Sequence, residues 1–65
     1  MTVELRYGQK VTASKATLNY LSSAIHHAAR DYERDGFPAL ANEAHENSKA
    51  IYNALDATGF YDEFR

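Results

Sequence analysis

The sequence lacks the residues that small proteins use as covalent or metal staples. It has no cysteine, which excludes disulfides, and three histidines without cysteine give little support to a four-ligand zinc site. A chain of 65 residues buries only about 60% of the surface that its unfolded form exposes. Its core is therefore marginal, and we expect very regular helix packing or association with a second copy of the chain.

Long apolar runs and glycine-rich loops are also absent. No stretch approaches the roughly 20 apolar residues of a membrane span, and the N-terminal residues contain no apolar run of the signal-peptide kind, so we expect a soluble, cytoplasmic protein. The glycines Gly8, Gly36 and Gly59 are isolated from one another, so they form no phosphate-binding loop. No nucleophile motif or metal-ligand spacing occurs either. We therefore predict a protein that is not an enzyme and that uses no cofactor or metal.

Apolar residues recur at steps of three and four over residues 14–35, which predicts an α-helix with one apolar stripe. The stripe consists of Leu18, Leu21, Ile25, Ala28 and Tyr32. Ser14 or Thr12 can cap the start of this helix through a side-chain oxygen. After its end, Gly36 can adopt the left-handed conformation, and Phe37 then folds back onto Tyr32.

A second helix is predicted over residues 38–58. Pro38 suits its first position, and the same spacing recurs in a stripe of Ala41, Ala44, Ser48, Ile51 and Leu55, widened by Leu40 and Tyr52. Gly59 and Phe60 repeat the helix stop of the first helix, with Phe60 returning onto Leu55. We expect the aromatic tail, Phe60, Tyr61 and Phe64, to cover Leu18, Leu21 or the N-terminal arm, within one chain or across a dimer.

Two helices of about 30 Å joined by a very short turn form an antiparallel hairpin. The predicted fold is all-α, a single domain over 1–65 with an N-terminal arm (1–12), a helical hairpin (13–58) and a C-terminal tail (59–65). Apolar residues extend beyond one stripe on each helix, so we expect two hairpins to pair as a homodimeric four-helix bundle. The residues predicted in the core or dimer seam are Leu18, Leu21, Ile25, Tyr32, Phe37, Leu40, Ile51, Tyr52, Leu55 and Phe60.

The N-terminal arm carries the alternation of a half-buried strand. Val3, Leu5 and Tyr7 alternate with Glu4 and Arg6. Three arrangements stay open: a local hairpin through residues 8–9 onto residues 10–12, pairing with the same strand of a second chain, or an irregular arm along the helices.

One line of side chains on the outer face of the first helix is a candidate binding surface. Tyr20, His27 and Arg34 recur at steps of seven, with Arg30 beside them. Aromatic and arginine side chains carry much of the binding energy at interfaces, although a solvated helix face explains the same pattern. His27 and Asp31 lie one turn apart, but two ligands do not make a metal site.

The favoured function is a small non-enzymatic homodimer that acts through contact with another macromolecule, most simply an unidentified protein. As an alternative, a strand followed by two helices resembles the ribbon-helix-helix family of DNA-binding repressors and antitoxins. That resemblance implies a DNA-reading face of Thr2, Glu4 and Arg6. The acid at its centre and the net charge of −2 argue against nucleic acid as the main partner. A small inhibitor of the kind encoded by phages and mobile elements is the third possibility.

Overall fold

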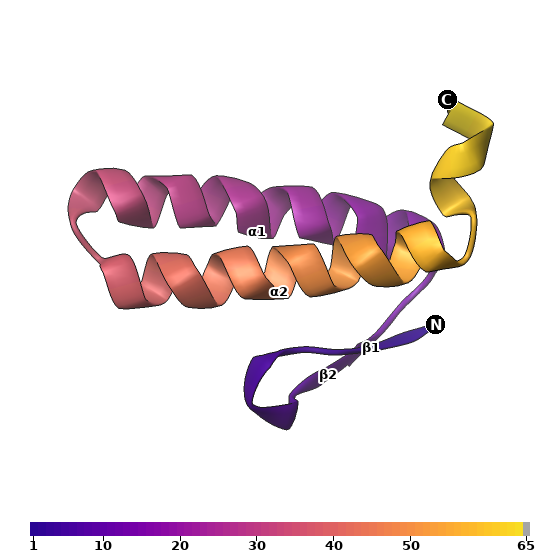
Figure 1. The fold of residues 1–65 in the computed structure, drawn as a ribbon, viewed down its shortest axis with the longest axis horizontal. Coiled ribbons are helices and arrows are strands. Elements are labelled where there is room, and N and C mark those ends of the chain that lie inside the picture. The colour runs from indigo at the N-terminus through magenta and orange to yellow at the C-terminus, as the bar shows by residue number, and fades with distance from the viewer. Residues whose placement is uncertain (65) are drawn as a thin grey trace.

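Two antiparallel helices and a short β-hairpin form the computed structural model, which describes residues 1–64. The elements in chain order are β1 (Thr2–Glu4), the 3-10 turn η1 (Arg6–Gly8), β2 (Lys10–Thr12), α1 (Lys15–Asp35), α2 (Pro38–Ala57) and the 3-10 segment η2 (Phe60–Phe64). Figure 1 shows α1 and α2 side by side, with the β-hairpin along α2 on the side away from α1. The dimensions are 36 × 27 × 15 Å, so the molecule is little more than one helix thick.

The helical hairpin is confirmed, and its helix bounds agree with the prediction to within one residue. α1 starts at Lys15, after Ser14, whose Oγ accepts a hydrogen bond from the Thr17 N–H at 3.1 Å. Ser14 is thus the N-cap, and Thr12 belongs to β2. Pro38 occupies the first turn of α2, where its missing N–H costs no hydrogen bond.

The turn between the helices is the predicted glycine stop. Gly36 has φ 85°, and its N–H donates to the Glu33 carbonyl at 3.3 Å. The Phe37 N–H donates to the Tyr32 carbonyl at 2.8 Å, which completes a Schellman motif. The Phe37 ring packs edge-on against Tyr32, with ring centroids 6.5 Å apart. The fold-back of Phe37 onto Tyr32 is therefore confirmed.

The core lies toward the end of the helical hairpin opposite this turn. Val3, Leu18, Ile51 and Leu55 are buried there, and partly buried residues surround them, among them Leu5, Val11, Leu21, Ile25, Phe60 and Tyr61. Four of the residues predicted in the core or dimer seam, Tyr32, Phe37, Leu40 and Tyr52, lie outside the core of the single chain, where they are exposed, and their place in a dimer seam stays a prediction. They flank the seam or lie at the turn, where no second layer covers them.

The stripe of α1 that faces α2 also differs from the prediction. The buried residues are Leu18, Ser22 and Ala29, whereas Leu21 and Ala28 are only half-buried. The observed stripe through Leu18, Ser22 and Ala29 contains only one large apolar residue. A prediction based on apolar residues therefore places the stripe about one position away, at Leu21 and Ala28. On α2 the predicted Ala41, Ser48, Ile51 and Leu55 are all buried.

The N-terminal arm forms the local hairpin, one of the three arrangements left open. β1 pairs antiparallel with β2 in the register Thr2 to Thr12, Val3 to Val11 and Glu4 to Lys10. This hairpin packs against α2: the Arg6 N–H donates to Asn47 Oδ1 at 2.9 Å, and Arg6 Nε lies 3.2 Å from Glu46 Oε2. The fold is thus mostly helical, with a two-stranded sheet.

Candidate binding groove between the helices

A groove with a volume of about 580 Å³ opens between α1 and α2. Its walls carry Asn19, Ser23 and His26 from α1 and His45, Lys49 and Tyr52 from α2, and Tyr61 of η2 also contributes to the lining. The volume falls in the range of binding sites for small ligands or for a few side chains of a partner.

The floor of the groove is narrow because two serines meet across it. Ser22 Oγ donates to the Ser48 carbonyl and Ser48 Oγ donates to the Ser22 carbonyl, each at 2.9 Å. Both hydroxyls are therefore already hydrogen-bonded, and a ligand would be recognised by the walls.

Two histidines meet across the groove at the end nearer the turn between the helices. The ring centroids of His26 and His45 lie 5.7 Å apart at an interplanar angle of 66°. His45 Nε2 also contacts Glu33 Oε1, which orients the His45 ring. Among residues 1–64, no three His, Cys, Asp or Glu side chains are placed to hold a metal ion. The pair thus provides planar rings with polar edges, suited to contact with aromatic and charged groups.

One end of the groove is aromatic. The rings of Tyr52 and Tyr61 stack with centroids 4.9 Å apart at 24°, and the Tyr61 hydroxyl donates to Asn19 Oδ1 at 2.8 Å. Gly59, at φ 79°, lies between α2 and η2, where the chain turns to bring Tyr61 back to α1. Desolvation raises the pKa of the Tyr61 phenol above its usual value, with smaller contributions from Tyr52 and Asp56.

Lys49 gives the groove a positive charge. It forms no ion pair within residues 1–64, whereas the carboxylate of Glu33 contacts His45. An anionic group entering the groove would thus meet an unpaired ammonium.

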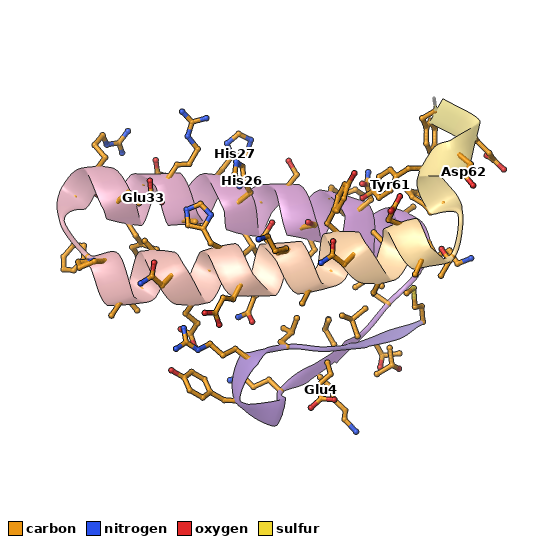
Figure 2. The ribbon with its side chains drawn as sticks, in the orientation of Figure 1. Glu4, His26, His27, Glu33, Tyr61 and Asp62 are labelled. Atoms are coloured by element: carbon orange, nitrogen blue, oxygen red, sulfur yellow. The ribbon has the colours of Figure 1, made fainter. Side chains whose placement is uncertain are left out.

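The predicted line of Tyr20, His27 and Arg34 lies on the edge of α1 away from α2. Figure 2 shows His27 there, and Tyr20 is 63% exposed. Arg34 pairs with Asp31 at 3.2 Å and with Asp35 at 3.5 Å, so its charge is partly neutralised. Arg30 is exposed.

The groove uses the α1 residues beside that line, Asn19, Ser23 and His26. On α2, the sequence reasoning missed His45 and Lys49 as groove residues, whereas Tyr52 was predicted in the core or dimer seam. Their signal is present, since His45, Lys49 and Tyr52 recur at steps of four and three along the flank of the buried stripe.

The residues of the ribbon alternative belong to the β-hairpin and its turn, and two of them, Thr2 and Arg6, make side-chain contacts within the chain. Thr2 Oγ1 lies 2.7 Å from Thr12 Oγ1, Glu4 lies opposite Lys10, and Arg6 contacts α2. Figure 2 shows Glu4 on the β-hairpin, far from α1. Sequence-specific DNA binding by this strand stays a prediction, and the position of the β-hairpin against α2 does not support it.

The tail prediction is confirmed for two of its three aromatic residues. Phe60 and Tyr61 pack against the core cluster that contains Leu18 and Leu55, whereas Phe64 is 70% exposed. Phe64 keeps one aromatic neighbour, Phe60, with ring centroids 5.6 Å apart.

Within residues 1–64, no helix combines the length and apolar character needed to cross a membrane. Comparison with known proteins found no matching family model, and neither a curated protein nor a solved structure with significant similarity.

Proposed function

We propose that this protein is a non-enzymatic homodimer that acts by contact with another protein. The observation that carries the proposal is the distribution of its large apolar side chains. The large side chains that are fully buried are Leu18, Ile51 and Leu55. Eight large hydrophobic side chains of residues 1–64 are at least 37% exposed: Met1, Tyr7, Tyr20, Tyr32, Phe37, Leu40, Tyr52 and Phe64. So much exposed apolar surface on a thin molecule favours association.

The exposed side chains concentrate in places that a partner could cover. Tyr32, Phe37 and Leu40 lie close together in sequence around the turn between α1 and α2, and Tyr52 lines the groove. Tyr and Phe are enriched at the buried centre of protein–protein interfaces, and Tyr is frequent among the residues that contribute most of the binding energy. A second copy of the chain that covers one of these two surfaces would complete the predicted four-helix bundle and leave the other surface for a different protein.

Sedimentation equilibrium tests the assembly. The expected mass is twice the chain mass of 7.3 kDa. Leu40→Ser should weaken the dimer if the turn surface is covered, whereas Tyr7→Ser, a change of an exposed side chain on the β-hairpin, is the matched control. Circular dichroism would verify that both variants keep their helices. A folded wild-type protein that stays monomeric at high concentration would rule out the homodimer.

A further inference from the structure

The groove already holds part of the chain's own C-terminal segment. Tyr61 stacks on Tyr52 and donates its hydroxyl proton to Asn19, so the aromatic end of the groove binds a ring that is followed in sequence by Asp62 and Glu63. The contact within the chain indicates that this end of the groove accepts an aromatic ring.

The remainder of the groove suits the same chemistry. His26 and His45 present ring faces and edges there, Ser23 offers a hydroxyl, and Lys49 adds an ammonium group without an ion pair in residues 1–64. An acidic side chain would pair with Lys49, while an aromatic ring would pack against the imidazoles.

The last described residues of the C-terminal segment carry groups that are complementary to the groove. Phe64 is 70% exposed, and Glu63 is exposed without an ion pair among residues 1–64. The same chain's groove does not receive them, because Tyr61, three residues before Phe64, is already bound at the aromatic end.

We propose that the groove of one copy receives Glu63 and Phe64 of a second copy, with Glu63 paired to Lys49 and the Phe64 ring against His26 and His45. In a two-fold dimer the contact forms twice, since each chain provides one groove and one C-terminal segment. This inference rests on the proposed homodimer and names the residues that form it.

A charge exchange between Lys49 and Glu63 tests the contact. Lys49→Glu and Glu63→Lys each place like charges together at both copies of the contact, and each variant should weaken the dimer about tenfold or more in low salt. Both side chains are exposed, so the fold of each chain should be unaffected. Lys10→Glu, on the β-hairpin, is the matched control and should leave the dissociation constant unchanged.

Mixing the two weakened variants provides the decisive measurement. In the mixed dimer the Glu63→Lys chain meets a Glu at position 49, and the Lys49→Glu chain meets the native Lys49, so both contacts are again attractive. Sedimentation equilibrium of the mixture should show recovered association, and Phe64→Ala should weaken the wild-type dimer.

The outcomes separate this inference from the proposed function. A wild-type dimer whose dissociation constant is the same in both charge variants overturns the groove contact and leaves the homodimer standing. Weakening in both variants without recovery in the mixture also overturns the contact, since the effect would then be general repulsion. A monomeric wild-type protein overturns the homodimer itself.

Discussion

Ser22 and Ser48 exchange two hydrogen bonds across the seam between α1 and α2, each hydroxyl donating to the other residue's backbone carbonyl at 2.9 Å. Such an exchange requires closely approaching backbones, which small side chains permit. Ala29 and Ala41 are buried in the same seam. The close approach sets the width of the groove floor and leaves the larger side chains at the groove walls.

Enlarging Ser48 should therefore destabilise the helical hairpin. Ser48→Leu introduces volume where the helices touch and is expected to lower the free energy of unfolding by about 1–3 kcal/mol, whereas Ser48→Ala, which loses the hydroxyl donor, should cost about 1 kcal/mol. Urea unfolding followed by circular dichroism measures both. Ser23 is exposed next to Ser22, so Ser23→Leu is the control and should change the free energy of unfolding little. Equal stability of Ser48→Leu and wild type would contradict the tight seam.

Asn47 should hold the β-hairpin against α2. Its Oδ1 accepts the Arg6 N–H at 2.9 Å in a part-buried position, so Asn47→Ala leaves that donor without its partner. We expect a loss of about 1 kcal/mol and faster hydrogen exchange at the Arg6 amide. Asn53→Ala, an exposed asparagine on the same helix, is the matched control. Unchanged exchange at Arg6 in the Asn47 variant would mean that the Asn47 hydrogen bond does not hold the β-hairpin against α2.

The C-terminal segment should stabilise each chain mainly through Phe60 and Tyr61. Deleting residues 60–65 is expected to lower the melting temperature by several degrees, because a loss of 1 kcal/mol shifts it by about 4–8 °C in a domain of this size. Tyr61→Ala should reproduce much of this loss, and Phe64→Ala little of it, in protein dilute enough to be monomeric. A melting temperature unaffected by the deletion would show that the segment contributes nothing to stability.

Alkaline pH should weaken the contact between Tyr61 and Asn19. The raised pKa of the phenol means that the folded chain holds this proton more tightly than the unfolded chain. The stabilisation is present at neutral pH and is lost as the pH rises through about 10 and above, where the unfolded chain ionises first. Urea unfolding across this range measures the effect. Tyr61→Phe should show a shallower decline, and identical declines would contradict the assignment to Tyr61.

Local signals in the sequence were sufficient for the helices and the turn. Pro38 marks the start of α2, while Gly36 and Phe37 mark the reversal after α1, and all three act through backbone geometry within a few residues. The strand alternation of the arm was equally readable. The pairing partner of this strand could not be predicted. A short strand can pair with a local or a distant strand, and which of the two it pairs with depends on the tertiary contacts around it.

Periodicity, side-chain size and turn chemistry are enough to predict a helical hairpin with a small-residue seam and an aromatic end. Which flank of each helix faces the other depends on packing between the helices. The tertiary structure placed His26 opposite His45 and brought Tyr61 to Asn19, across 42 positions of the chain. At the observed rotation of the helices, the hydroxyls of Ser22 and Ser48 each reach the other residue's carbonyl. The residue pattern within one helix does not specify this rotation, because it depends on contacts with the other helix.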